Sequence, residues 1–487
     1  MKRILLILLS ALIMITLGCS KDISENQSSN HAEYDEKQQD DMARSRNNNP
    51  SDTTTENSVY GPSHPNYEME VLYDSKKHEI RGSISVQFMN NLNKILNEVY
   101  FNLWPKADDF EDGDISVTNV KYNGVKANVD VDGNHLKVSG FSLPKNKRAK
   151  ISMSFTVKVP EQQHRFGWDG TSVSLGNWFP ILAVYDNNGW NLYPYFEEGE
   201  SFYSLTGDYD VILTTDDDMV VAATGKQIER VSKRNGQATY RFKAQNVRDF
   251  AIQMNPDYRV TTEIVDGIQM NVYHTKEQDR YKEYIIDSSR QALEIFNKKI
   301  GSYAWDELHI VGMDCGFGGM EYPQLILICT NEVHDEHYIR TVVAHEIGHQ
   351  WFYAAIGNNQ YKEPWLDESF ATFMEELGTS GLEHMIDEEF KEPKHPYRLD
   401  SPVYTFVQQG DQGMAAYSDY IYSYGLKTLD DLRIELGDDA FYKAMRQYYQ
   451  EMKFKIATTS DFISIVENAT GEDLSKFFED HYIEVDK

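Results

Sequence analysis

Two histidines and a glutamate stand close together in the second half of the chain, in the run His345, Glu346, Ile347, Gly348 and His349. Residues 338–356 around this run have apolar side chains at helical spacing. Residues four apart lie on one face of a helix, with Cβ atoms about 5–6 Å apart, so the two imidazoles can bind one metal ion. Glu346 lies beside that face, where its carboxylate can act as a general base toward a water molecule.

A catalytic zinc site needs a third protein ligand and an open position for water. Eighteen residues separate His349 from Glu368, and Gly357 and Pro364 break the segment between them. Residues 369–377 again have helical spacing, so a helix, a loop and a second helix would return Glu368 to the first helix. An acid at a helix start is otherwise explained by the helix dipole.

These motifs, in this order, resemble the aminopeptidase N family of zinc metallopeptidases, which are gluzincins with a thermolysin-like catalytic domain. The matching segments are H-E-I-G-H-Q-W-F and W-L-D-E-S-F-A, placed so that eighteen residues separate His349 from Glu368. The resemblance implies one Zn²⁺ per chain, bound by His345, His349 and Glu368. It also implies that Glu346 activates the water molecule and later passes the proton to the leaving amine.

A further acid, Glu375, follows Glu368 by seven residues and so lies two turns along the same helix face. The resemblance implies that Glu375 hydrogen-bonds a ligand histidine, which would fix the tautomer of that imidazole. The alternative is one more exposed helix acid beside Glu376.

The family also has a Gly-Ala-Met-Glu-Asn motif upstream of the zinc ligands, and the corresponding residues here are Gly318, Gly319, Met320, Glu321 and Tyr322. In the family this glutamate binds the free α-amino group of the peptide, a role that Glu321 would fill through a charge-assisted hydrogen bond. Gly319 keeps a close backbone approach where alanine is usual. Tyr322 replaces asparagine, which leaves the geometry of the substrate edge open. The alternative is an ordinary glycine turn before a strand at residues 325–328.

A tyrosine three residues before a glycine completes the set of family motifs. Tyr422 precedes Gly425 in this way, with Tyr424 where lysine is usual. By the resemblance, Tyr422 donates a hydrogen bond to the oxyanion of the tetrahedral intermediate. Its rivals in the same stretch are Tyr417, Tyr420 and Tyr424.

The rest of the sequence predicts two folded domains of different character. Residues 67–254 are a succession of short alternating runs, such as 79–88, separated by Gly, Asn and Asp. We therefore expect a β-sandwich-like domain over residues 61–256. Residues 257–487 should form a mainly α-helical, thermolysin-like domain with a small sheet, which gives the chain an α+β fold. The helical stretches are 282–297, 425–436, 438–452 and 460–467, and the strand-like runs are 268–273 and 308–311.

The N-terminus indicates export. Residues 1–19 have two basic residues, an apolar run and a small residue before Cys19, the pattern of a signal peptide. The run is shorter than the roughly 20 residues of a membrane-spanning helix. Its end resembles a bacterial lipoprotein signal with a lipidated Cys19, although Thr16 departs from the usual aliphatic residue. A plain secretory signal is the alternative, and both interpretations predict an extracytoplasmic protein.

A polar tether and an acidic surface follow from composition. Residues 20–60 contain scarcely any aliphatic side chains, which predicts a disordered spacer between a lipid anchor and the folded domains. The formal net charge is -30, and there is no basic patch with interleaved aromatic residues. Both observations argue against nucleic acid as a partner.

Two cysteines remain besides the one in the signal. Cys315 and Cys329 can form a disulfide in an oxidising compartment or remain buried thiols, and neither is part of a C-x-x-C metal motif. Of these alternatives we favour free thiols.

The sequence therefore predicts a lipid-anchored zinc aminopeptidase that acts on peptides. Larger family members add a helical C-terminal domain that caps the active site, whereas this chain ends soon after Tyr422. We therefore expect a more open cleft, which makes a zinc endopeptidase the first alternative. A surface-binding protein that keeps the fold without turnover is the second. Side-chain preference and oligomeric state do not follow from the sequence.

Overall fold

The computed structural model describes residues 60–110, 112–196, 199–200, 202–331, 335–379, 382 and 397–485. The signal peptide, the lipoprotein cysteine and nearly all of the predicted tether lie outside these ranges. Within them, no helix is both long enough and apolar enough to cross a membrane.

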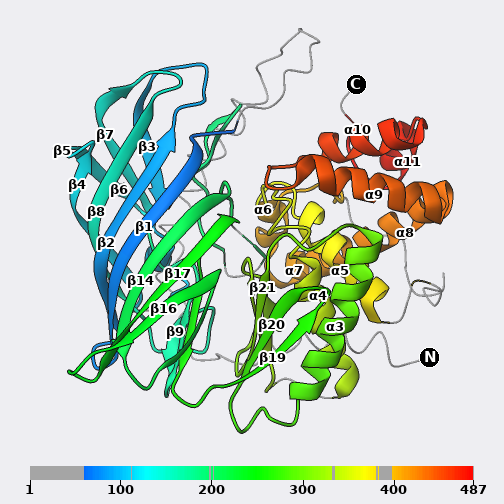
Figure 1. Ribbon diagram of the computed structural model, residues 1–487. Helices are drawn as coiled ribbons and strands as arrows, with labels where there is room; N and C mark the ends of the chain where they lie inside the picture. The colour runs from blue at the N-terminus through cyan, green and yellow to red at the C-terminus, as the bar shows by residue number, and fades with distance from the viewer. Residues whose placement is uncertain are drawn as a thin grey trace.

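The N-terminal part of the described chain consists of β-sheets (left in Figure 1). Its largest sheet has eight strands in the order β16-β17-β14-β1-β2-β8-β4-β5, in which β1 and β14 are parallel and the other neighbours antiparallel. Strands such as β2 and β8 bury every second side chain, as their alternating sequences predict. The bounds are β1 (Ser63–Asp74), β2 (Glu79–Met89), β4 (Asp114–Tyr122), β5 (Val125–Lys126), β8 (Arg148–Lys158), β14 (Gly207–Asp216), β16 (Lys226–Ser232) and β17 (Gln237–Val247).

Two four-stranded sheets and a hairpin complete this β-rich part. The first sheet contains β9 (Phe166–Asp169), β10 (Ser172–Leu175), β15 (Val220–Ala223) and β18 (Ile252–Asn255). The second contains β3 (Leu96–Asn102), β6 (Asn128–Asp132), β7 (His135–Leu143) and β11 (Ile181–Leu182), and the hairpin is β12 (Tyr185–Asp186) with β13 (Gly189–Trp190). A short 3₁₀ turn, η1 (Trp104–Lys106), follows β3.

A five-stranded sheet joins the β-rich part to the helices. Its order is β19-β20-β21-β23-β22, with bounds β19 (Arg259–Val265), β20 (Ile268–His274), β21 (Glu307–Met313), β22 (Gly319–Met320) and β23 (Leu325–Cys329). Alternate residues of β23 face opposite cores: Leu325 and Leu327 pack with the β-rich part, while Ile326 and Ile328 pack with the helices. Because both faces are covered, β23 is apolar at every position.

The helices cover the other face of this sheet and form the C-terminal part of the molecule (right in Figure 1). Their bounds are α3 (Lys282–Lys299), α4 (Glu336–Gly348), α5 (Trp365–Thr379), α6 (Val403–Val407), α7 (Gly410–Tyr417), α8 (Gly425–Leu436), α9 (Asp438–Met452), α10 (Thr459–Thr470) and α11 (Ser475–Asp480). A π-helical segment, η3 (Ser418–Tyr424), joins α7 to α8. The predicted α+β class, with a β-rich N-terminal part and a helical C-terminal part, is confirmed. The domain boundary at residue 256 stays a prediction.

The helix that carries the histidines is shorter than predicted. We expected it to span residues 338–356, but α4 ends at Gly348 and His349 is its C-cap. Beyond it the backbone turns back on itself, because Tyr353 has a φ of 122° and Ala354 N–H bonds the carbonyl of His349. Apolar residues continue past the helix end because this turn is itself buried, so their periodicity did not reveal the break.

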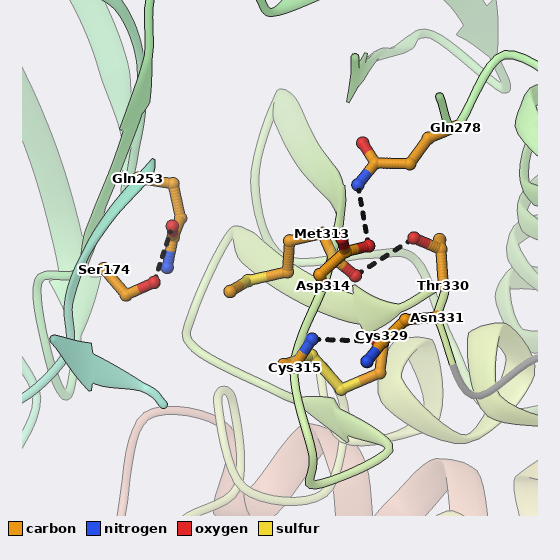
Figure 2. The surroundings of a disulfide bond; sticks show 9 residues. All are labelled: Ser174, Gln253, Gln278, Met313, Asp314, Cys315, Cys329, Thr330 and Asn331. Carbon is orange, nitrogen blue, oxygen red and sulfur yellow. Dashed lines mark hydrogen bonds between the residues drawn. A yellow bond between two sulfur atoms is a disulfide. The ribbon is translucent and has the colours of Figure 1, made fainter. Parts of the chain in front are cut away.

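The preference for free thiols was wrong. Cys315 and Cys329 form a disulfide, with their Cα atoms 5.1 Å apart (Figure 2). The reason lies in the sheet register: Met313 on β21 pairs with Cys329 on β23, which brings Cys315 alongside. The closed loop contains Gly318 to Glu321, the segment that the sequence assigns to substrate recognition.

Candidate active site

The end of α4 and the start of α5 bring the predicted metal ligands together. Asp335 caps the N-terminus of α4 by accepting a hydrogen bond from Tyr338 N–H, while His345 lies in the last turn of the helix. The start of α5 is fixed by Trp365, whose Nε1 donates to Thr459 Oγ1 at 2.9 Å. Glu368 follows Trp365 by three residues and lies in the first turn of α5.

Three donor atoms converge between these helices. His345 Nε2 lies 3.1 Å from His349 Nε2, and Glu368 Oε2 lies 3.3 Å from the first nitrogen and 3.4 Å from the second. Ligands held tetrahedrally at about 2.0–2.1 Å from one zinc ion are about 3.3 Å apart. The triangle that these atoms form therefore fits three corners of a tetrahedral zinc site.

The outer nitrogens of both imidazoles face carboxylates, which sets the tautomers. His345 Nδ1 lies 3.1 Å from Glu375 Oε2, and His349 Nδ1 lies 2.6 Å from Asp367 Oδ1. Carboxylate oxygens accept hydrogen bonds, so each Nδ1 carries the proton and each Nε2 presents a lone pair toward the other ligands. In that state three lone pairs face one another, an arrangement that suits a bound cation.

The charges of the site support the same conclusion. Burial would lower the pKa of His345, but hydrogen bonds with Glu368 and Glu375 raise it to about 10. Without a bound cation the histidines are protonated on both ring nitrogens. Burial likewise opposes ionisation of Glu368, whereas the charge of His349 and hydrogen bonds from both histidines hold its pKa well below the usual range. The surrounding carboxylates therefore stabilise positive charge at the place where the three ligand atoms meet.

A second group of candidate ligands overlaps the first. Glu321, His349 and Asp367 also place one ligand atom each within 4.8 Å of one another. Asp367, however, already binds His349 and accepts a hydrogen bond from Gln360 Nε2. Its oxygens are thus engaged in orienting a histidine, and the set of His345, His349 and Glu368 is the better metal site.

Glu346 lies on the side of α4 that faces the short edge strand β22. It is 6% exposed, and a Cβ at Gly319 would overlap its carboxylate, so the glycine makes room for this side chain. Glu346 Oε2 is buried and has no hydrogen-bond partner among the described residues. Burial, partly offset by the charges of the two histidines, raises the pKa of Glu346 to about 7.

Glu321 is the other buried carboxylate without a full set of partners. It is 4% exposed, and within the described ranges its Oε1 accepts no hydrogen bond. Burial raises the pKa of Glu321 to about 8, partly offset by the charge of His349. Its backbone carbonyl accepts a hydrogen bond from Gln350 Nε2 at 3.1 Å, so the residue after the second histidine holds this segment in place.

Tyr422 is the tyrosine nearest to the ligands in this stretch. Its ring stacks on His345 with centroids 6.0 Å apart, and burial together with the charge of nearby Glu368 raises the pKa of its hydroxyl well above the usual value. Ser369 Oγ donates to the carbonyl of Ile421 at 2.5 Å, which ties the π-helical segment η3 to α5. π-helical segments often occur at functional sites, because the extra residue re-aims the side chains that follow.

The three rival tyrosines lie in different surroundings. Tyr417 packs against Tyr422, with ring centroids 6.0 Å apart, and its buried hydroxyl has no partner in the part of the chain that the structure describes. Tyr420 packs with Phe406 in the helical core, and Tyr424 packs near the C-terminal helix. The ring contact with His345 thus distinguishes Tyr422 from Tyr420 and Tyr424.

Comparison with known proteins places this site within a described family. Residues 284–481 match the peptidase family M1 domain. This part of the chain is therefore an M1 peptidase domain. The resemblance to the aminopeptidase N family is confirmed, and the predicted metal ligands, Glu346, Glu321 and Tyr422 all lie in the M1 domain.

Relatives of the M1 domain include several aminopeptidases. Human glutamyl aminopeptidase is 29% identical over 224 residues, which cover 42% of this chain and 23% of the relative. Aminopeptidase N of Lactobacillus helveticus is 28% identical over 238 residues, covering 44% of this chain and 28% of the relative. The matched segment thus spans about a quarter of these relatives' length. The fold is similar to that of an M1 zinc metallopeptidase from Deinococcus radiodurans, with a TM-score of 0.62, 14% identity, and coverage of 88% of this chain and 94% of that one.

Sequence reasoning missed three residues around the M1 site. Asp367 was passed over although it precedes Glu368 at the helix start, and its position next to a ligand could have identified it. Arg165 and Glu200 form a buried ion pair, with Arg165 Nη1 at 2.8 and 2.9 Å from the two carboxylate oxygens. This pair lies close enough to Glu321 for their charges to interact, yet it comes from loops of the β-rich part, where no motif marks it.

Proposed function

We propose that this chain is a zinc-dependent aminopeptidase that removes N-terminal residues from peptides. The Glu321 carboxylate lies beside the triangle of metal ligands, and its Oε1 has no partner among the described residues. This oxygen carries the aminopeptidase assignment. A buried carboxylate without a partner costs free energy unless a ligand supplies the missing charge. A free α-ammonium group supplies that charge and its hydrogen bonds together.

The remaining groups suit amide hydrolysis. Zinc, when bound, acts as a Lewis acid and makes water more acidic. Glu346 accepts a proton on its free Oε2 and then donates it to the leaving amine, a transfer for which a pKa near neutrality is favourable. Tyr422 donates its hydroxyl hydrogen to the oxygen of the scissile carbonyl. Asp367 and Glu375 keep the histidines in the required tautomer.

The cellular location is part of the proposal. We infer an extracytoplasmic protein that is held at the membrane through a lipid on Cys19. The sequence of residues 1–19 supports this inference, and so does the disulfide, because disulfides persist mainly in oxidising compartments. Metabolic labelling with a fatty-acid analogue tests it: Cys19→Ala should abolish the label, and equal labelling of this variant would contradict the anchor.

A paired peptide assay tests the activity. The protein should cleave a peptide with a free N-terminus, should spare the N-acetylated form, and should lose activity with a chelator and regain it with Zn²⁺. Glu321→Gln should lower kcat/KM on the free peptide by roughly 10- to 100-fold, the value of a charge-assisted hydrogen bond. The exposed acid Glu294 on α3 provides a control, since Glu294→Gln should leave the rate unchanged.

Two other results would each replace the proposal. Cleavage of the free and acetylated peptides at equal rates would indicate an endopeptidase. Zinc binding without hydrolysis of either peptide would indicate a surface-binding protein that keeps the fold.

A further inference from the structure

The residue after Glu321 extends into the β-rich part of the molecule. Tyr322 is fully buried, and its hydroxyl donates a hydrogen bond to Asn177 Oδ1 at 3.3 Å. Asn177 Nδ2 in turn donates to a carboxylate oxygen of Asp249, and both of these residues are also buried. A chain of hydrogen bonds therefore connects the recognition segment of the M1 domain to residues nearly 150 positions earlier in the sequence.

A glycine in the β-rich part makes room for this tyrosine. A Cβ at Gly176 would overlap the Tyr322 hydroxyl and would lie 2.5 Å from its Cζ. Asn177 follows with a φ of 50°, in the left-handed region that asparagine tolerates better than most residues. The Gly176-Asn177 turn thus provides both the space for the tyrosine ring and the acceptor for its hydroxyl.

Main-chain pairing holds the recognition segment, Gly318 to Glu321, at only a few points. Strand β22 is two residues long and pairs with β23 alone in its sheet. The amide of Gln350 reaches the carbonyl oxygens of Glu321 and Tyr322 at 3.1 and 3.2 Å, and its Oε1 accepts from Gln324 N–H at 2.8 Å. These bonds fix the backbone beyond Glu321, and the buried Tyr322 ring restricts rotation of that backbone. Neither contact involves the Glu321 Oε1 oxygen.

We propose that Tyr322 is a positioning residue that holds Glu321 in place for the substrate's α-ammonium group, with Gly176 as its required complement. This inference rests on the proposed aminopeptidase activity. It also explains how the chain accommodates a tyrosine where the aminopeptidase N motif has an asparagine. The space for the ring comes from a different part of the molecule.

The consequence for kinetics separates positioning from simple packing. If Tyr322 orients Glu321, weakening its anchor should raise KM for free-amine peptides while kcat and the zinc content change little. If the ring only fills a core, its loss should lower the melting temperature and leave KM alone.

A double-mutant cycle tests the pairing of the two residues. Gly176→Ala should lower kcat/KM on a free-amine peptide by roughly 10- to 100-fold, because overpacking displaces the ring. A Tyr322→Leu background removes the hydroxyl and ring atoms that the new Cβ would overlap most, and leaves its 2.9 Å contact with the Arg165 carbonyl. In that background the same glycine change should cost at least about fivefold less. An equal cost of Gly176→Ala in both backgrounds would overturn the proposal. An inactive wild-type protein would instead refute the proposed function.

A milder pair of variants gives a result even if the alanine variant does not fold. Tyr322→Phe removes only the hydroxyl that bonds Asn177, and KM should rise about three- to tenfold, the range of one neutral hydrogen bond. Tyr448→Phe is the matched control, because Tyr448 is equally buried in the helical core, and among the described residues its hydroxyl has no partner. Zinc content is measured by metal analysis. An unchanged KM in Tyr322→Phe, or an equal rise in Tyr448→Phe, would contradict the positioning role.

Discussion

Two clusters of side chains meet at the active site, and they are built in different ways. The metal-ligand cluster consists of His345, His349, Glu368, Asp367 and Glu375, which lie on or at the end of two consecutive helices. The recognition cluster consists of Glu321, Tyr322, Gln350, Asn177 and Gly176, which come from three segments spread over much of the chain. In the first cluster acids and imidazoles are paired. In the second, one oxygen of the Glu321 carboxylate has no partner within the part of the chain that the structure describes.

The difference follows from what each cluster has to bind. A metal site must offer several lone pairs at fixed distances, which helix geometry provides over a short stretch of sequence. A recognition site must keep one buried carboxyl group without a full set of partners until substrate arrives, and such a group is unstable unless other parts of the fold hold it. We therefore expect substitutions in the first cluster to affect metal binding and kcat, and those in the second to affect mainly KM.

The largest effect should come from Glu346, which lies between the two clusters. Glu346→Gln keeps the size of the side chain but removes the proton acceptor, so kcat should fall by about 10²- to 10⁴-fold. KM and zinc content should stay close to wild type, in contrast to Glu321→Gln. Steady-state kinetics with metal analysis measures both. A rise in KM as large as that of Glu321→Gln would break the division between the clusters.

Tyr422→Phe should have the next largest effect. The hydroxyl is the part of Tyr422 that can reach a developing oxyanion, and loss of such a donor lowers kcat by about 10²- to 10³-fold. Zinc content should not change, because the ring that stacks on His345 remains. Tyr420→Phe is the comparison, since Tyr420 packs in the helical core. Equal losses of kcat in the two variants would contradict the assignment of Tyr422 as the donor to the oxyanion.

Asp367→Asn tests how far the metal-ligand cluster depends on its supporting acids. Asp367 bonds His349 at 2.6 Å, and its side chain is 1% exposed. Neutralising it should weaken zinc binding by about 10- to 100-fold, as measured by competition with a chelator. Glu375→Gln should have a smaller effect, because the Glu375 side chain is 13% exposed and its bond to His345 is longer. An unchanged zinc affinity in Asp367→Asn would contradict the role of Asp367 in orienting His349.

The sequence predicted the metal-ligand cluster well because that cluster is local. Spacing along two helices indicated His345, His349 and Glu368, and the family resemblance added Glu375. The structure places these four residues together. Their catalytic and metal-binding roles stay predictions until they are measured. The bounds of α8 and α9 agreed with the helical stretches predicted from periodicity, since Gly437, with a φ of 75°, separates the two helices where the apolar spacing is also interrupted.

The recognition cluster could not be predicted in the same way. Nothing in the sequence pairs Tyr322 with Gly176, because their contact depends on how the five-stranded sheet packs against the β-rich part. The same limit explains the error over Cys315, whose partner was set by strand register. It also explains why the ion pair of Arg165 and Glu200 was missed.

The smallest expected effect concerns a histidine beside the recognition cluster. His164 packs against Phe317, the residue before Gly318, and its Nδ1 is buried without a partner among the described residues. Burial, together with the charge of Arg165, lowers the pKa of His164 from its usual value near 6.5 to about 3. In the unfolded chain the ring takes up a proton near pH 6.5, whereas in the folded protein it stays neutral.

The unfolded state therefore binds more protons as the pH falls from 6.5 toward 3, and this histidine lowers the free energy of unfolding over that range. Its contribution to stability is complete above pH 6.5 and is lost on acidification, by about 1 kcal/mol between pH 6 and pH 5. His164→Gln should make the acid-side decline shallower by that amount in urea unfolding at pH 7, 6 and 5. The exposed His337 provides the control, since His337→Gln should leave the decline as it is. If the free energy of unfolding of His164→Gln declined with pH as steeply as that of the wild type, His164 would have to be accessible to water in the folded protein. The recognition cluster would then be less tightly packed than the metal-ligand cluster.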